Sequence, residues 1–365
     1  MAESSVAGFG SDSTADSMAP NLPSRNPRLP LELEREVFEM AASSLGNIFN
    51  LILVASRVKE WIEPLLYRVV VRVYNRNDGL PRFTPFETLV HKIGSKPPVF
   101  WSKSVKSLAF YGIEEQDPVE QILTACTGLV RLCTASPRSR FLPALKNFPA
   151  LRHLCIEIEA LFGGLSFVDF AHPAFHNITH LELLDVPRAS ADERAHQICT
   201  GLVHIPKLTH IALNAEVMYR ALFPLLYLLT HLRAIVLLGR IRADLGFDLP
   251  THLTMEGRFV SIRQTDWKRD WLSGADTGED FWALADKFLA ARRAGKVDRS
   301  RFNIYDDEDE WLAVAGGFRI CDTASGQPTI DFTSIIRAAS IIQPSFSSFK
   351  GVTYPRHMWE KASTP

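Results

Sequence analysis

The sequence predicts an α/β protein in which a short N-terminal helical module precedes an irregular α/β solenoid built on a parallel sheet. Two observations lead to this fold class. A short apolar motif recurs along the middle of the chain, and groups of apolar residues at helical spacing come before it. At 365 residues the chain is also longer than one compact core usually is, so it needs two domains or an extended repeat array.

The helical module is expected over residues 28–66. Pro30 suits the first turn of a helix, because the N–H that proline lacks has no partner there. Leu33, Val37 and Phe38 follow at helical spacing, and the last apolar group of the module contains Trp61. Three helices this short bury little surface by themselves, so the module is expected to pack against a partner.

The recurrent motif has the form apolar-x-x-apolar-x-apolar, and its last two apolar positions alternate as a half-buried strand requires. Copies begin at residues 105, 129, 151, 178, 208, 232 and 259. The steps of 22 to 30 residues straddle the period of leucine-rich repeats. Helix-compatible segments such as 118–125, 191–202 and 216–228 lie between copies. One strand and one helix per repeat predict a curved, leucine-rich-repeat-like solenoid over residues 67–300.

The irregularity of the repeat leaves a second interpretation open. The Asn that normally closes each turn of a leucine-rich repeat is missing from its expected offset. The alternative is an α/β domain with buried parallel strands and no true repeat symmetry.

The order of residues in the N-terminal module resembles a known family. Leu-Pro, Glu-Leu, Val-Phe-Glu, Leu-Val-Ala and Trp-Ile-Glu-Pro-Leu-Leu-Tyr-Arg follow one another between residues 29 and 68. This order is similar to the F-box of fungal, basidiomycete-type F-box-like proteins. The resemblance implies a substrate-recognition adaptor of a Skp–cullin–F-box ubiquitin ligase, which has no active site of its own.

The same resemblance implies which side chains pack the module or dock the Skp-type linker protein, and through it a cullin. They are Leu29, Pro30, Leu33, Val37, Phe38, Leu53, Val54 and Trp61. The repeat domain would hold an unknown protein substrate. The alternative function is a non-catalytic interaction scaffold whose F-box-like helices only cap the solenoid. Exposure of Leu33, Val37 and Phe38 would favour docking, whereas burial against the first repeat would favour the cap.

Three histidines occupy the same slot in three copies of the motif. His153, His180 and His210 each come just before the second apolar residue, so they should stack on neighbouring strands roughly 5 Å apart. On the concave face they would form a protonation-sensitive or metal-binding ladder, or contact a substrate. The alternative is that they are polar side chains at the rim of the sheet that hydrogen-bond locally. No cysteine or carboxylate shares the slot to complete a ligand set, so no metal is predicted.

The two ends of the chain differ from the middle. Residues 1–27 are rich in Ser, Ala, Gly, Asp and Pro, a composition that predicts disorder. A helix over 279–293 is expected to cap the apolar edge of the last repeat. Residues 301–365 form a C-terminal extension for which the sequence predicts no particular fold.

The composition and the motifs of the chain argue against several classes of function. A net charge of −1 argues against binding to nucleic acid or to an anionic membrane, and no signal peptide or membrane span is expected. Five cysteines without paired spacing suggest reduced thiols and an intracellular, cytoplasmic or nuclear protein. None of the common nucleotide-binding, hydrolase or metalloprotease motifs occurs, so neither an enzyme nor a cofactor is predicted.

Overall fold

The computed structural model describes residues 29–42, 45–72, 83–111, 117–135, 137, 139–164, 168–184, 191–214, 226–239, 255–263 and 266–304. All of them belong to one compact unit. The predicted disordered tail, most of the helix expected over 216–228 and nearly all of the extension 301–365 lie outside the described residues.

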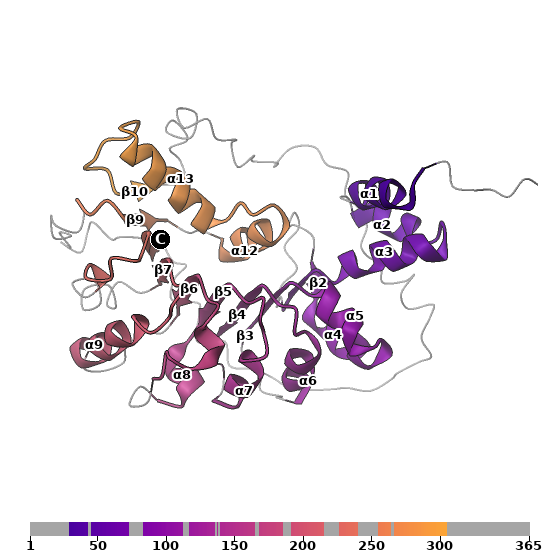
Figure 1. Ribbon diagram of the computed structural model, residues 1–365, viewed down its shortest axis with the longest axis horizontal. Coiled ribbons are helices and arrows are strands. Elements are labelled where there is room, and N and C mark those ends of the chain that lie inside the picture. The colour runs from indigo at the N-terminus through magenta and orange to yellow at the C-terminus, as the bar shows by residue number, and fades with distance from the viewer. Residues whose placement is uncertain are drawn as a thin grey trace, which may run out of the picture. The chain divides into compact units, whose positions relative to one another are not determined.

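Three helices form the N-terminal module, as the spacing of apolar residues predicts (Figure 1). They are α1 (Leu31–Ala41), α2 (Leu45–Leu51) and α3 (Ser56–Leu66). Ala42, Ile48, Val58 and Ile62 are buried at the centre of the module. An ion pair of 2.6 Å between Arg57 and Glu34 also joins α3 to α1. The module therefore has a small apolar core of its own.

A ten-stranded sheet, parallel throughout, follows the module, and with the helices between and after its strands it confirms the predicted α/β class. Its strands are β1 (Val69–Val71), β2 (Thr84–Pro85), β3 (Ser107–Tyr111), β4 (Arg131–Ala135), β5 (His153–Ile156), β6 (His180–Leu183), β7 (His210–Leu213), β8 (Ala234–Leu238), β9 (Phe259–Ile262) and β10 (Asn303–Ile304). The spatial order is β10-β9-β8-β7-β6-β5-β4-β3-β1-β2. Each copy of the motif supplies one strand, β3 to β9. The order is sequential from β3 to β10, whereas β1 lies between β3 and the edge strand β2. This all-parallel arrangement is compatible with a solenoid.

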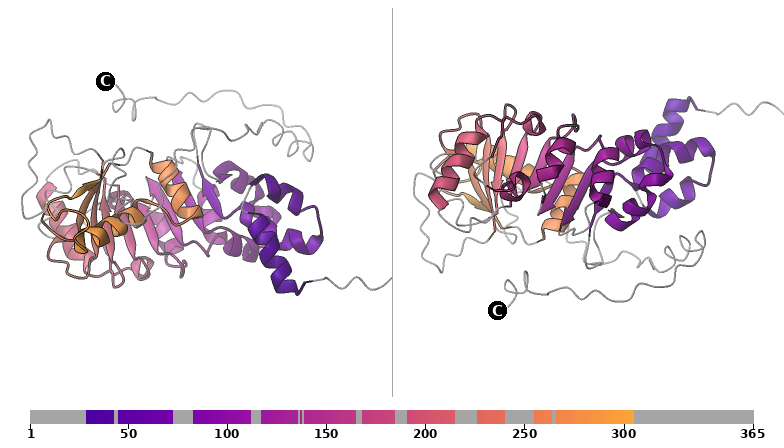
Figure 2. Two further views of the ribbon diagram at one scale, coloured as in Figure 1. Left: turned by 90° about the horizontal axis from the view of Figure 1, so that it is seen from above. Right: turned by 90° about the horizontal axis from the view of Figure 1, so that it is seen from below.

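Helices and 3₁₀ turns cover one face of the sheet (Figures 1 and 2). They are α4 (Phe86–Lys92), η1 (Ile93–Ser95), α5 (Pro98–Ser104), α6 (Asp117–Ala125), η2 (Ser139–Phe141), α7 (Leu142–Leu145), α8 (Ile158–Phe162), η4 (Pro173–Phe175) and α9 (Ala191–Leu202). In β3 to β8 the second apolar residue of the motif copy points to this face; Leu108, Leu154 and Ile211, for example, are all inaccessible or nearly so. In β9 the same position, Ile262, points to the opposite face. The main core of the protein lies between these helices and the sheet.

The last two helices among the described residues cover the opposite, inner face (Figure 2). They are α12 (Trp267–Asp276) and α13 (Phe281–Arg293). Trp271 and Leu272 of α12 pack against the small residues Ala109, Cys133 and Cys155 on β3 to β5. Small side chains at this position in the strands leave room for a helix to approach the sheet closely.

Helix α13 matches the helix predicted over 279–293, but it lies at another position on the sheet than the one expected. Phe281, Phe288 and Leu289 pack on the inner face of β8 and β9, and the edge of β9 is paired with β10. The expected role was to cap the last repeat at its edge. The helix lies on the inner face because Ala212, Ala234 and neighbouring apolar side chains there also need cover, which the helical pattern alone does not reveal.

Candidate functional site

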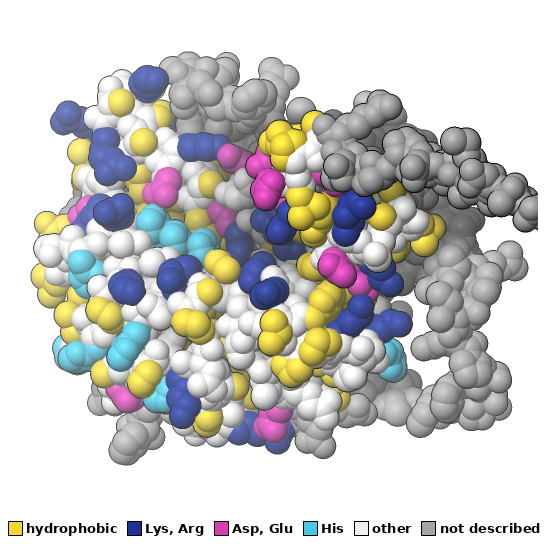
Figure 3. Space-filling model, turned by 45° about the vertical axis from the view of Figure 1, so that its right-hand side comes forward, with side chains coloured by type: hydrophobic (Ala, Val, Ile, Leu, Met, Phe, Trp, Pro, Cys, Tyr) yellow, Lys and Arg dark blue, Asp and Glu magenta, His cyan; other side chains and the backbone are white. Residues whose placement is uncertain are grey.

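One candidate site is an exposed apolar face on the N-terminal module. Leu33, Val37 and Met40 lie at i, i+4 and i+7 of α1, so they share one side of the helix, and they are 47%, 48% and 66% exposed. Leu53, in the turn after α2, is 82% exposed. We call these residues, together with Leu29, Leu31 and Val54, the N-terminal apolar face. Figure 3 shows hydrophobic side chains gathered over this part of the molecule.

The residues that the sequence assigned to linker docking divide into two groups. Leu29, Pro30, Leu33, Val37, Leu53 and Val54 are exposed. Phe38 and Trp61 are half-buried and lie with their ring centroids 6.4 Å apart against the core of the module. Phe38 and Trp61 thus contribute to the packing of the module, and the other six lie on its surface.

The module joins the sheet domain through α3, on a side that leaves the N-terminal apolar face uncovered by the described residues. Tyr67, just after α3, makes edge-on ring contacts with Phe100 and Trp101 of α5, at 5.8 and 5.0 Å between centroids. Lys96 pairs with Glu63 of α3 at 2.9 Å. This attachment uses the end of α3 and does not involve Leu33 or Val37.

The second candidate site lies on the inner face of the sheet, where the three histidines stack as the repeat predicts. Parallel pairing in register places His153, His180 and His210 side by side on β5, β6 and β7. Their rings lie 4.2 and 4.1 Å apart between centroids and are stacked in nearly parallel planes. Trp282 of α13 stands edge-on to His180 and His210. Nε2 of His210 lies 3.1 Å from Oδ1 of Asp286.

The environment keeps two of these imidazoles uncharged. Burial lowers the pKa of His153 to about 3, with a further contribution from the charge of Arg131. Burial also lowers the pKa of His180 to about 2, and neighbouring histidines add to the effect. The two rings are therefore neutral at physiological pH and act as hydrogen-bonding groups, not as cations.

Arg131 continues the histidine row on β4, because its Cα pairs with that of His153. It forms a 2.8 Å ion pair with Asp280, and both side chains are almost completely buried. Its guanidinium also lies 4.7 Å from the centre of the Trp271 ring. Asp280 accepts a hydrogen bond from the backbone N–H of Ala283 at 3.0 Å and so caps α13. This pair fixes the α12–α13 turn to the sheet.

Arg131 was not among the predicted site residues, although its position in the motif is a signal. Arg131 occupies the same slot of the motif copy beginning at residue 129 that the histidines occupy in later copies. Alignment of the weak copy with the strong ones would have placed it in the row. Asp280 and Trp282 offered no comparable signal, since their approach to β4 and β6 depends on long-range packing.

Two further carboxyl groups, those of Glu182 and Asp270, lie near the Arg131–Asp280 ion pair. Burial raises the pKa of Glu182, whose carboxylate accepts a hydrogen bond from the side chain of Asn214. Burial, together with the charges of Asp280 and Glu182, raises the pKa of Asp270 to about 8. The inner face thus holds a cluster of acidic groups around one guanidinium, and Asp270 is protonated at neutral pH.

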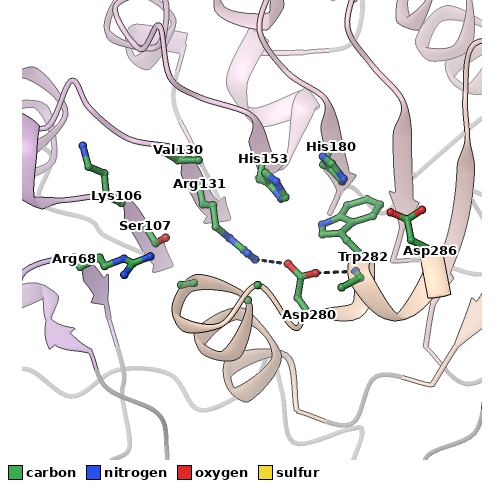
Figure 4. A pocket seen from close by; sticks show the side chains of 14 residues that line it. Arg68, Lys106, Ser107, Val130, Arg131, His153, His180, Asp280, Trp282 and Asp286 are labelled. Atoms are coloured by element: carbon green, nitrogen blue, oxygen red, sulfur yellow. Dashed lines mark hydrogen bonds and ion pairs between the residues drawn. The ribbon is translucent and has the colours of Figure 1, made fainter. Parts of the chain in front are cut away.

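A hollow of about 450 Å³ opens between the histidine row and the α12–α13 turn (Figure 4). It is lined by Arg68, Lys106, Ser107, Val130, Arg131, His153, His180, Gly274, Ala275, Gly278, Asp280, Trp282, Ala283 and Asp286. Figure 3 shows histidine side chains gathered at the surface of the sheet domain. Most of the inner face is covered by α12 and α13, so this hollow is where the histidine row meets solvent.

The chain matches none of the known family models, and no curated protein matches it. No group of three or more potential metal-ligating side chains occurs among the residues that the structure describes. Within the same residues, no helix is long and apolar enough to cross a lipid bilayer.

The close approach of α12 to β4 predicts that Gly274→Ala destabilises the protein. An added Cβ would lie 2.5 Å from Nη1 of Arg131 and 2.6 Å from Cβ and Oδ2 of Asp280, so the ion pair must shift. We expect the free energy of unfolding to fall by roughly 1–3 kcal/mol, as overpacking usually costs. Urea-induced unfolding measures it. Gly94→Ala, where nothing lies within 4 Å, is the matched control, and equal stability of both variants would contradict this close approach.

The raised pKa of Asp270 predicts a pH dependence of stability. The folded chain keeps a proton that the unfolded chain releases between about pH 4 and about pH 8, so this group lowers the free energy of unfolding as the pH rises. Asp270→Asn removes that effect, because the amide stays neutral. We expect the variant to gain stability relative to the parent protein as the pH rises to 8. Asp276→Asn, at an exposed position of the same helix, is the control. A parallel pH dependence for the parent and Asp270→Asn would refute the assignment.

Proposed function

We propose that this protein is a substrate-recognition adaptor of a Skp–cullin–F-box ubiquitin ligase. The N-terminal module would bind the Skp-type linker protein, which connects to a cullin, and the leucine-rich-repeat-like sheet domain would hold a protein substrate. Other subunits would carry out ubiquitin transfer. The observation that carries the proposal is the N-terminal apolar face, which is exposed on a module whose sequence resembles an F-box.

The exposure of this face supports docking because the module does not need it for folding. Ala42, Ile48, Val58 and Ile62 already fill the interior of the module, while Leu33 and Val37 on the adjacent side of α1 stay accessible. Monomeric proteins rarely expose large contiguous apolar patches unless a partner covers them. Burial of one Leu side chain contributes about 1.5–3 kcal/mol, so a few such anchors suffice for a specific interface.

The alternative, a module that only caps the solenoid, receives less support. A cap would bury Leu33 and Val37 against the first strands and helices of the sheet domain. These side chains are instead exposed, and the module meets the sheet domain through α3 and α5. The arrangement therefore favours an interface with another protein over a purely structural role.

The linker interface predicts that Leu33→Ala and Leu53→Ala each weaken binding to a Skp-type linker protein. Truncation of a central apolar anchor usually costs about 1–2 kcal/mol or more, so we expect roughly a tenfold rise in Kd for each variant. Both residues are exposed, so the fold should remain intact. Isothermal titration calorimetry with the purified linker protein measures the change.

Val99→Ala provides the matched control, because Val99 on α5 is also apolar and 63% exposed but lies outside the module. It should bind the linker protein as the parent chain does. A parent chain that fails to form a complex, or a Leu33→Ala variant with unchanged affinity, would exclude the proposed interface.

A further inference from the structure

Two side chains that line the hollow on the inner face carry buried nitrogen atoms for which the described part of the chain provides no hydrogen-bond partner. Arg131 is 7% exposed, and its Nε has no hydrogen-bond partner within the described part of the chain. The same is true of the buried Nδ1 of His153. Figure 4 shows both side chains extending from their strands toward the α12–α13 turn. Because buried polar groups are nearly always paired, these atoms mark a place where a polar ligand group fits.

Arg68 adds a cation at the open side of the same hollow. It precedes β1 directly and is exposed, and its guanidinium forms no ion pair with a carboxylate that the structure describes. Ser107, at the start of β3, brings a hydroxyl to the wall between Arg68 and Arg131 (Figure 4). Guanidinium, hydroxyl and imidazole groups therefore converge on one side of the hollow.

The charges of the lining side chains favour a ligand with a single negative charge. Arg68, Lys106 and Arg131 are cationic, Asp280 and Asp286 are acidic, and the two histidines are neutral, which leaves one positive charge in excess. Nζ of Lys106 is held by the backbone carbonyls of Ser102 and Gly128. Arg68 is thus the cation best able to meet an incoming anion, and arginine pairs with planar carboxylates through two parallel hydrogen bonds.

A phosphate group fits these charges less well. A phosphorylated side chain carries about −1.5 to −2 charges at neutral pH, and the fixed carboxylates of Asp280 and Asp286 would repel the excess. The volume of about 450 Å³ lies at the small end of ligand pockets, which typically span about 300–1,000 Å³. It suits one or two residues of an extended peptide.

The geometry points to a carboxylate-binding pocket that recognises an acidic residue or the C-terminal carboxylate of a substrate peptide. Arg68 would pair with the carboxylate at the entrance. Deeper inside, Arg131 would donate a hydrogen bond and His153 would donate or accept one. The identification of the ligand as part of a substrate rests on the adaptor function proposed above. Binding itself does not need the linker protein, so failure of one proposal leaves the other testable.

Fluorescence anisotropy on the full chain alone tests this pocket with labelled alanine-based pentapeptides. One peptide carries a free C-terminal carboxylate, a second has an amidated end and one internal Glu, and a third has an amidated end and Gln in place of Glu. A fourth, amidated peptide carries phosphoserine. We expect one or both of the carboxylate peptides to bind at least about tenfold more tightly than the neutral peptide, as a charged hydrogen bond provides. The response of the first two peptides distinguishes the terminal from the side-chain carboxylate.

Two substitutions, one that removes a positive charge and one that removes a negative charge, test whether the peptide binds in this pocket. Arg68→Ala should weaken the preferred peptide about tenfold, whereas Arg299→Ala, an exposed site that does not line the hollow, should leave it unchanged. Asp286→Asn removes a repelling charge while its amide can still hydrogen-bond to Nε2 of His210, so affinity should rise. Equal binding of the neutral peptide, preference for phosphoserine, an unaffected Arg68→Ala variant or weaker binding by Asp286→Asn would each overturn the proposal.

Discussion

The buried ion pair between Arg131 and Asp280 is the interaction on which the inner face of this protein depends. It links β4 to the start of α13, and the two residues are 149 positions apart in the sequence. A buried pair contributes little net stability, but loss of one partner leaves a buried charge that costs about 3–5 kcal/mol. The pair therefore acts chiefly as a positional constraint. Gly274 permits the close approach, and Trp271 covers the guanidinium.

Once the α12–α13 turn is fixed, the remaining features of the inner face follow. Trp282 packs edge-on against His180 and His210, and the carboxylate of Asp286 lies beside Nε2 of His210. The helices cover the inner face of the sheet where the strand residues are small, and they leave the region around Arg68 and Ser107 open. The hollow is thus a consequence of where two helices end. His153 and His180, which line the hollow, are neutral because most of each side chain is buried.

The sequence alone predicted the parts of the fold that depend on local pattern. Each of the seven motif copies became a strand, and the shared slot of His153, His180 and His210 correctly predicted a stack of rings, because parallel strands in register repeat the same position. The three short helices of the module were also predictable from apolar spacing. For the candidate site, the sequence identified the histidines and the exposed leucines but not their different environments.

The rest could not be predicted because it depends on contacts between distant segments. Nothing in the helical pattern of residues 279–293 distinguishes an edge cap from a helix on the inner face, since both bury one apolar side. β2 and β10 contain two residues each, too few to show a period. Likewise, the half-burial of Phe38 and Trp61 follows from their mutual packing in the module, while Leu33 beside them stays exposed.

Hydrogen–deuterium exchange of the full chain, with and without a purified Skp-type linker protein, tests the central claim most directly. The account predicts that the linker protein slows exchange in α1 and in the turn after α2, while exchange in α13 and the strands of the sheet stays the same. Backbone amides at an interface lose contact with solvent and open less often. Unchanged exchange throughout the module, or protection confined to the sheet domain, would contradict the claim that the N-terminal apolar face is the docking surface.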